Sequence, residues 1–377
     1  MQTSQEYALQ HPDSVPLVIA QLDSLGGAER SLLAMARWLH SQGRAAHLVV
    51  YEDQCNFAQY ADFPLPIHEL KPAGGVRAKI AALKQYFATH HYTSRPLLSG
   101  YQPALHATLA RIGSFHCLMH DTPVLFEVEE LRDQSFKQRL RTWVSNKIIG
   151  IGLRRGQTIV TSEFLQQDCR KEFGVRAQIA RMGGFVSLSG FVRRPFDGEL
   201  RLLSVCRIEA NKRVDWMLNA LASLERQQPP LSSQIPWRFD LAGKGSLLEA
   251  MRARAAELGL SERVHFHGFV PDDALDGLYD SAHLFLMPAV QGYGIPAVEA
   301  LARGIPVLLH RDSGVSDILL DTPWASVLTG GEEELAPKLE AMMRFLATNG
   351  QMSAPPPPAL PTEDEWAHRV ASLCGYV

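Results

Sequence analysis

The chain has 377 residues, of which 46% are apolar and 20% charged, and its formal net charge is −3. This composition suits a globular protein of about two domains, and the charge gives no bulk attraction to nucleic acid or anionic lipid. Five scattered cysteines without a C-x-x-C pair favour reduced thiols over a disulfide framework or a zinc site.

The start of the sequence has no basic and apolar leader, and no apolar run approaches the roughly 18 residues that span a bilayer. We therefore expect a soluble, cytoplasmic protein, whose contact with a membrane, if it makes any, is limited to the membrane surface.

Strands and helices alternate through the first half of the chain. An apolar strand at 15–21 is followed by Gly26 and Gly27, a helix that ends near Gly43, and a strand at 47–51. This order is a βαβ unit, and one interpretation of the glycine pair is a tight turn with no ligand. Further helices are predicted at 79–90, 104–112 and 164–173, and further strands at 96–99, 115–119 and 158–161.

His120 follows directly after the predicted strand 115–119. In open α/β sheets, ligands bind at the carboxyl ends of the strands, so His120 is a candidate site residue. The alternative is a loop histidine that is hydrogen-bonded to its own turn.

The stretch 131–156 is unusually basic, with apolar side chains between the cations. A basic amphipathic helix can lie on an anionic membrane surface. A half-buried helix with a solvated face has the same pattern, and the sequence leaves both interpretations open.

The second half again alternates strands with polar turns. Strands are predicted at 202–207, 237–242 and 264–270, and the turns after the first two carry Lys212 and Lys244. Helices are predicted at 272–282, 335–346 and 363–373.

The segment from Leu284 to Leu308 has the strongest pattern in the chain. A short apolar strand is followed by the loop Gln291–Gly294 and by a helix that starts near Ile295, with Pro296 in its first turn, where proline is tolerated. Gly292 and Gly294 allow close approach to the backbone, and a helix N-terminus favours anions. The sequence therefore predicts an anion-binding strand–loop–helix unit.

This segment resembles the E-x7-E region of retaining glycosyltransferases with the GT-B fold, in particular glycosyltransferase family 4. The family pattern is roughly P-S-x-x-E-x-F-G-x-x-x-x-E-A-x-A-x-G-x-P-V, which this chain follows at Pro288, Tyr293-Gly294, Glu299-Ala300, Ala302, Gly304 and Pro306-Val307. The first glutamate of the pattern is Gln291 here. Arg207 with Lys212 resembles a second family motif, and Ser313–Asp317 resembles the family's GG-x-x-E turn with Asp317 for glutamate.

The resemblance implies an α/β protein of the GT-B type, with two Rossmann-like doubly wound domains that face a central cleft. The expected ranges are 1–184 for the acceptor-binding domain, 185–199 for a linker, 200–355 for the nucleotide-sugar-binding domain and 356–377 for a helix that crosses back to the first domain.

The resemblance also implies roles for individual residues. The leaving phosphates would be held by Arg207, Lys212 and the backbone of Gly294 and Ile295, the donor sugar by Gln291 and the ribose by Glu299. Further donor contacts are implied at Gly26, Gly27, Lys244, Phe269, Val270, Gly292 and Tyr293, and His120 would lie beside the donor sugar and the acceptor.

The implied activity is transfer, with retention and without a metal or other cofactor, of a sugar from a UDP- or GDP-sugar to a glycan, a lipid-linked or a small-molecule acceptor. No nucleic-acid partner is expected. Two alternatives stay open: a nucleotide-sugar 2-epimerase of the same fold, and a non-catalytic GT-B subunit. The second stays open because Gln291 stands where the family pattern has a glutamate.

Overall fold

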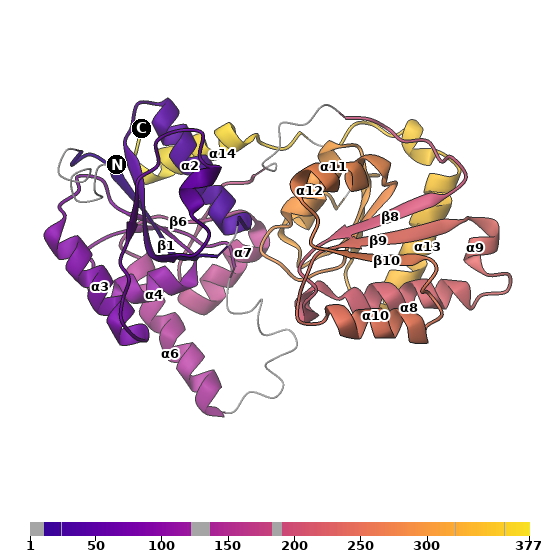
Figure 1. Ribbon diagram of the computed structural model, residues 1–377, viewed down its shortest axis with the longest axis horizontal. Coiled ribbons are helices and arrows are strands. Elements are labelled where there is room, and N and C mark those ends of the chain that lie inside the picture. The colour runs from indigo at the N-terminus through magenta and orange to yellow at the C-terminus, as the bar shows by residue number, and fades with distance from the viewer. Residues whose placement is uncertain (1–10, 24, 122–135, 183–190, 321, 358) are drawn as a thin grey trace. The chain divides into compact units, whose positions relative to one another are not determined.

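The computed structural model describes residues 11–377 except 24, 122–135, 183–190, 321 and 358. The chain divides into two compact units, Met1–Phe185 with Leu360–Val377, and Val186–Ala359 (Figure 1). Parts of three predicted segments lie outside the described residues: 131–135 of the basic stretch, 185–190 of the linker and 358 near the final helix.

The first unit is built on a seven-stranded parallel sheet in the order β3-β2-β1-β4-β5-β6-β7. After β1 the chain adds strands on one side of β1, and after β3 it adds them on the other, so the sheet is doubly wound. Its strands are β1 (Val15–Leu22), β2 (Ala46–Asp53), β3 (Ile67–Glu69), β4 (Leu97–Ser99), β5 (His116–Leu118), β6 (Thr158–Val160) and β7 (Gln178–Ile179).

Helices cover both faces of this sheet. α2 packs against α14, while α4 packs against α3 and α6 on the opposite face (Figure 1). The helices are α2 (Gly27–Ser41), α3 (Val76–Thr89), α4 (Tyr101–Leu109), α6 (Phe136–Leu153), α7 (Glu163–Asp168) and α14 (Glu363–Cys374).

The last helix, α14, belongs to the first unit. Thr362 and Glu365 close its first turn in a reciprocal capping box. Glu363 lies 3.1 Å from the guanidinium of Arg37 on α2, and Trp366 is buried. The return of the final helix to the first unit, expected from the resemblance, is confirmed.

Three helices differ from the sequence expectation. The helix predicted over 79–90 runs over Val76–Thr89. The helix predicted to begin at residue 104 begins at Tyr101, because Gly100 precedes it with a φ of 90° and Pro103 lies in the first turn. The helix predicted over 164–173 divides in two: α7 ends at Asp168, and Cys169–Phe173 forms a wider π turn.

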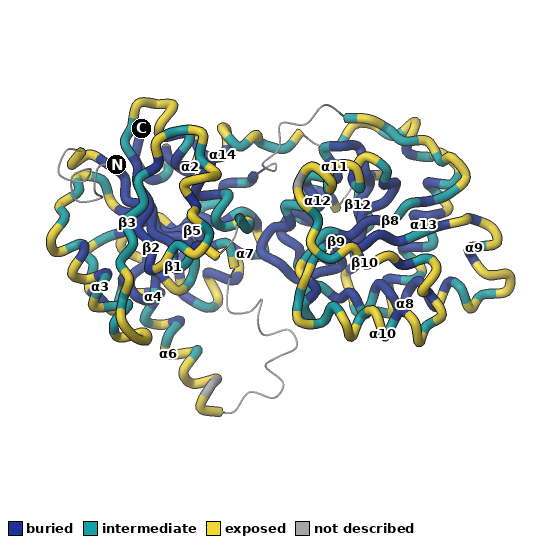
Figure 2. The backbone as a smooth tube through the Cα atoms, in the orientation of Figure 1, coloured by how far each residue is buried: buried dark blue, intermediate teal, exposed yellow. Residues whose placement is uncertain are grey.

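The second unit has a six-stranded parallel sheet in the order β10-β9-β8-β11-β12-β13. Its four inner strands are buried over most of their length (Figure 2). The strands of the sheet are β8 (Leu200–Val205), β9 (Trp237–Ala242), β10 (Val264–Gly268), β11 (Leu284–Met287), β12 (Val307–His310) and β13 (Ala325–Leu328).

The helices of the second unit also lie on both faces of its sheet. α8 packs against α10 and α13, and α11 and α12 lie on the other face (Figure 1). The helices are α8 (Val214–Glu225), α9 (Leu231–Gln234), α10 (Leu248–Glu257), α11 (Asp272–Ser281), α12 (Ile295–Ala302) and α13 (Leu335–Ala347).

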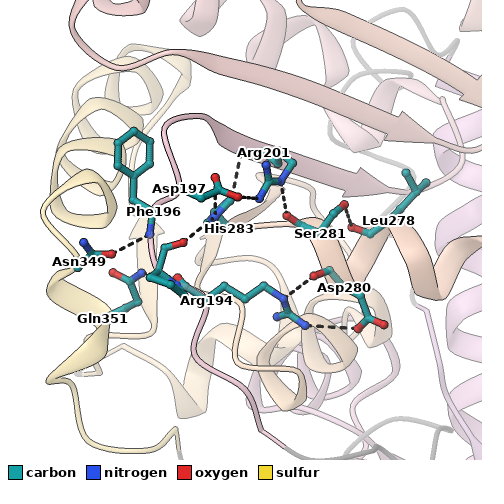
Figure 3. Close-up of polar contacts among 11 residues, drawn as sticks. Arg194, Phe196, Asp197, Arg201, Leu278, Asp280, Ser281, His283, Asn349 and Gln351 are labelled. Atoms are coloured by element: carbon teal, nitrogen blue, oxygen red, sulfur yellow. Dashed lines mark hydrogen bonds and ion pairs between the residues drawn. The ribbon is translucent and has the colours of Figure 1, made fainter.

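Residues 194–197, at the end of the expected linker, are fastened to the second unit (Figure 3). The guanidinium of Arg194 donates to the carbonyl oxygens of Asp280 and Arg303 at 2.5 and 2.9 Å. The backbone N–H of Phe196 donates to Asn349 at 2.7 Å. This segment therefore belongs to the second unit, ahead of β8.

Candidate active site

The sheet of the second unit changes winding direction between β8 and β11, and the loops after these two strands are fastened together. Asn211 and Val290 exchange two hydrogen bonds, at 3.2 and 3.4 Å. Arg213, which is buried and has a φ of 54°, donates to the carbonyl of Pro288 at 3.2 Å. In doubly wound sheets a ligand crevice lies at this point, so the topology directs attention to these two loops.

The turn after β9 presses its backbone against the segment after β8. A Cβ at Gly243 would lie 1.8 Å from the carbonyl oxygen of Cys206, and one at Gly245 would lie 2.2 Å from that of Ile208. The backbone N–H of Ile208 donates to the carbonyl of Lys244 at 2.9 Å. Only glycine permits this approach, so the packing of the two backbone segments alone explains why both positions are glycine.

Glu209 joins the same two segments through its carboxylate. It accepts from the backbone N–H of Ser246 at 2.9 Å and from the Ser246 hydroxyl at 2.5 Å. These two hydrogen bonds lower the pKa of Glu209, the hydroxyl contributing most. The carboxylate is therefore occupied in holding the turn that carries Lys244.

Lys212 and Gln291 are brought into direct contact. The Lys212 ammonium donates to Gln291 Oε1 at 3.0 Å, and Gln291 Nε2 donates to the hydroxyl of Ser313 at 3.0 Å. Gln291 is 8% exposed and Ser313 is fully buried. One series of hydrogen bonds thus connects the loops that follow β8, β11 and β12.

Gly294 caps α12 next to this chain. Its φ of 113° lies in the region that favours glycine. A Cβ there would stand 2.8 Å from Gln291 Nε2 and 3.2 Å from the Ser313 hydroxyl. Gly292 and Tyr293 are buried in the same loop, and Ile295 opens the helix. Because Gly294 has no side chain, it leaves room for the Gln291 amide.

Glu299 lies in the second turn of α12. The Tyr279 hydroxyl of α11 lies within reach of both the Glu299 carboxylate, at 3.4 Å, and the Pro296 carbonyl, at 3.2 Å. Burial raises the pKa of Tyr279, and the negative charge of Glu299 raises it further. Tyr279 thus stays a neutral hydrogen-bond donor toward the carboxylate.

Arg207, Lys244 and Phe269 are exposed at the same edge of the sheet. The Lys244 ammonium lies 5.5 Å from the centre of the Phe269 ring, a cation–π distance. Phe269 is 69% exposed and Val270 is partly exposed. A large apolar ring left open beside a lysine ammonium suits a planar ligand with negative charge.

The remaining predicted residues lie in the first unit. Gly26 is the N-cap of α2 and Gly27 its first residue, after β1. His120 follows β5, and its Nε2 lies 3.0 Å from the hydroxyl of Ser99 at the end of β4. Burial lowers the pKa of His120, against the opposing effect of Asp121. All three lie at the carboxyl edge of the first sheet.

Three contacts of the site were missed from the sequence: those of Ser313, Asn211 and Tyr279. Ser313 lies in a turn that the sequence analysis singled out, but nothing there indicated a contact with Gln291. Tyr279 carries no local signal at all. Among the described residues, no group of three or more His, Cys, Asp or Glu side chains is arranged to hold a metal ion.

Comparison with known proteins finds a family match in the second unit. Residues 191–344 match the family "Glycosyl transferases group 1". The match lies within the second unit and covers less than half of the chain. This range contains Arg207, Lys212, Lys244, Gln291 and Glu299.

Two relatives illustrate the sequence similarity. A GDP-mannose-dependent alpha-(1-6)-phosphatidylinositol monomannoside mannosyltransferase of Mycolicibacterium smegmatis is 31% identical over 140 residues, 34% of this chain and 35% of that protein. A D-inositol 3-phosphate glycosyltransferase of Nocardia farcinica is 33% identical over 137 residues, 36% of this chain and 30% of that protein. The chain thus matches about a third of the length of each curated relative.

The solved structures extend the similarity to the whole fold. The glycosyltransferase WaaG, involved in lipopolysaccharide biosynthesis, has a TM-score of 0.69 at 18% identity and covers 95% of each chain. Sucrose-phosphate synthase of Thermosynechococcus elongatus has a TM-score of 0.74 at 17% identity and covers 97% of this chain and 98% of its own. The GT-B fold predicted from the sequence, with two doubly wound parallel sheets, is confirmed.

Replacing Gly294 with alanine should destabilise the second unit. The positive φ costs a side chain about 1–2 kcal/mol, and the new Cβ displaces the Gln291 amide. Chemical denaturation should therefore show a loss of at least about 1 kcal/mol in the free energy of unfolding.

Gly277→Ala is the matched control for that experiment. Gly277 lies inside α11 with nothing within 4 Å of its Cβ position, so alanine should stabilise by about 0.5–1 kcal/mol. A Gly294→Ala variant as stable as the Gly277→Ala variant would contradict the account of the Gly294 turn.

Proposed function

We propose that the protein is a metal-independent, retaining glycosyltransferase that moves a sugar from a nucleoside diphosphate sugar to a hydroxyl acceptor. The observation that carries the proposal is the contact between Lys212 and Gln291 at the winding switch of the second sheet. This contact joins the cationic motif after β8 to the loop before α12. A donor whose diphosphate and sugar are both bound would have to reach both segments.

The diphosphate end of the donor would meet fixed positive charge. Arg207 and Lys212 stand after β8, and the N-terminus of α12 presents backbone N–H groups beyond Gly294. A departing diphosphate gains negative charge in the transition state, and pre-placed cations stabilise it at little reorganisation cost. These groups would do this without a metal ion.

The sugar, ribose and base would lie along the same edge. Gln291 would bind sugar hydroxyls, and the Glu299 carboxylate would accept hydrogen bonds from the two ribose hydroxyls. Phe269, Val270 and Lys244 would flank the base. Among the solved relatives, HepE of Anabaena was crystallised in complex with UDP, which supports a nucleoside diphosphate as the ligand of this fold.

The acceptor would be served by the first unit. Gly26, Gly27 and His120 lie at the carboxyl edge of its sheet. In the proposed front-side reaction, the acceptor hydroxyl attacks the anomeric carbon from the side of the leaving phosphate. The phosphate oxygen takes the acceptor's proton, so no protein nucleophile is needed and the α configuration is retained.

The donor site is tested first by binding. UDP, GDP, ADP, CMP and dTDP are added separately, with EDTA present, and thermal unfolding and calorimetric titration are recorded. A ligand at about 100 times its dissociation constant should stabilise the fold by about 2.7 kcal/mol. One nucleotide should stand out, and Lys212→Ala should abolish its effect.

Arg226→Ala is the charge-matched control, because Arg226 is exposed at the far end of α8. It should leave nucleotide binding unchanged. If no nucleotide binds, the protein is a non-catalytic GT-B subunit rather than a transferase.

Gln291→Glu should leave the transfer rate within about tenfold of wild type, which corresponds to about 1.4 kcal/mol in the activation barrier. The reason is that the side chain serves mainly to hold sugar hydroxyls, which an amide and a carboxylate both do. Steady-state transfer with the bound donor measures the effect. Complete loss, or a gain well beyond tenfold, would show that charge at residue 291 controls the reaction.

We also propose that α6 contacts an anionic membrane surface near the acceptor. No helix among the described residues is long and apolar enough to cross a membrane. The N-terminal half of α6 extends away from the sheet and is exposed (Figures 1 and 2). Phe136 is 80% exposed and Trp143 58%, and Leu140, Val144 and Ile151 are exposed as well.

The spacing of these apolar side chains places all five on one face of α6. Residues 136–155 carry six cations and no acidic residue: Lys137, Arg139, Arg141, Lys147, Arg154 and Arg155. An apolar stripe with cations beside it is the composition of a helix that lies in the interface of an anionic bilayer.

Vesicle binding tests this surface. The protein should sediment with phosphatidylcholine vesicles that contain phosphatidylglycerol and not with pure phosphatidylcholine. The double substitution Lys137→Ala/Arg141→Ala should weaken binding by roughly 30-fold, at about 1 kcal/mol for each cation, and Trp143→Ser should weaken it too. Arg77→Ala/Lys84→Ala removes the same charge from exposed sites on α3. Equal weakening by this control would make the effect one of net charge only.

A further inference from the structure

Ser313 is a hydrogen-bond partner of Gln291. At both positions the chain differs from the family pattern, and the two differing side chains are in contact. Gln291 stands where the pattern has its first glutamate, and Ser313 stands where the GG-x-x-E turn has its first glycine. They lie 22 residues apart in sequence, yet Gln291 Nε2 is 3.0 Å from the Ser313 hydroxyl. The backbone carbonyl of Gln291 also accepts from the N–H of Gly314 at 3.2 Å.

The hydrogen bonds around Gln291 determine which way its amide faces. Lys212 has only donors, so the atom 3.0 Å from it must be the amide oxygen. The amide nitrogen then needs an acceptor, which the Ser313 hydroxyl provides while it donates to the carbonyl of Tyr293 at 3.3 Å. The opposite orientation would turn the amide N–H groups toward the Lys212 ammonium, donor against donor, and is therefore excluded.

A glutamate at residue 291 would not use Ser313 in the same way. A carboxylate has no hydrogen to give, so the hydroxyl would have to turn away from Tyr293 to donate to it. An amide, in contrast, places an N–H in a buried position, where an acceptor is required. Serine at residue 313 therefore suits glutamine better than it suits glutamate.

We propose that Ser313 is a positioning residue that holds the Gln291 amide with its oxygen toward Lys212. The two departures from the family pattern then form one compensated pair. Lys212 keeps a neutral hydrogen-bond acceptor beside it instead of a carboxylate, and its positive charge is not cancelled at that contact. This inference rests on the proposed function in one respect, that Lys212 meets the diphosphate of the ligand.

The test is a double-substitution cycle read in two ways. Ser313→Ala is made in the wild type and in Gln291→Glu, and UDP and GDP are titrated into each purified protein by calorimetry. Ser313→Ala should raise the dissociation constant of the bound nucleotide about tenfold when residue 291 is glutamine, because a buried amide hydrogen loses its acceptor. With glutamate at residue 291 the rise should be threefold or less.

Ser316→Ala is the matched control. Ser316 is buried in the same turn, but its hydroxyl donates to the carbonyl of Arg311 at 2.8 Å. It should not change nucleotide affinity. An equal effect of Ser313→Ala in both backgrounds, or one no larger than that of Ser316→Ala, would overturn the inference.

Free energies of unfolding are also measured for the wild type, the two single variants and the double variant. They separate a positioning role of Ser313 in nucleotide binding from a purely structural contact with Gln291. Non-additive unfolding energies together with non-additive nucleotide affinities support the positioning role. Non-additive unfolding with additive affinities would leave Ser313 a purely structural contact and overturn the proposal. Failure of wild-type protein to bind UDP or GDP would instead contradict the proposed function, and the unfolding cycle would then still decide whether Ser313 holds the amide.

Discussion

The close approach of two backbone segments is the constraint on which the site in the second unit depends. Gly243 and Gly245 lie so near the carbonyls of Cys206 and Ile208 that no side chain fits between them. Two hydrogen bonds that the Glu209 carboxylate accepts from Ser246 hold the same segments together. The short turn that carries Lys212 starts from this rigid base, and its backbone is in turn tied to Val290. The position of the lysine is therefore fixed before any ligand arrives.

The loop before α12 is held from the other side. The backbone N–H of Gln291 donates to Asp312 at 3.1 Å, and that of Val315 donates to Tyr293 at 2.9 Å. The loops after β8, β11 and β12 are thus joined by main-chain hydrogen bonds, and side chains complete the assembly. Such a site gains its electrostatic effect from groups that need not reorganise during the reaction. Residue 291 joins this assembly as a neutral amide and brings no negative charge to it.

The sequence predicted the elements well and the long-range contacts poorly. The β–loop–α order around β11 and α12 was readable because apolar strands, glycines and Pro296 each act locally. The start of α4 was predicted three residues late, since the capping role of Gly100 depends on a backbone conformation rather than on an apolar pattern. The Gln291–Ser313 and Glu209–Ser246 contacts span 22 and 37 residues. No periodicity encodes them, because they follow from the way parallel strands bring loops to one edge.

The helix α6 is closely packed at its C-terminal end and exposes large apolar side chains at its N-terminal end. At its C-terminal end, a Cβ at Gly150 or Gly152 would lie 2.2 Å from the carbonyl of Phe173 or 2.0 Å from the hydroxyl of Thr108, so the helix packs with little space. At its N-terminal end, Phe136 and Trp143 stay exposed. Burying a large apolar side chain is worth about 1.5–3 kcal/mol, so leaving several on one face forgoes a free energy comparable with the whole stability of a typical domain. This exposed apolar face, beside cations and away from the core, is the observation on which the proposed membrane contact of α6 rests.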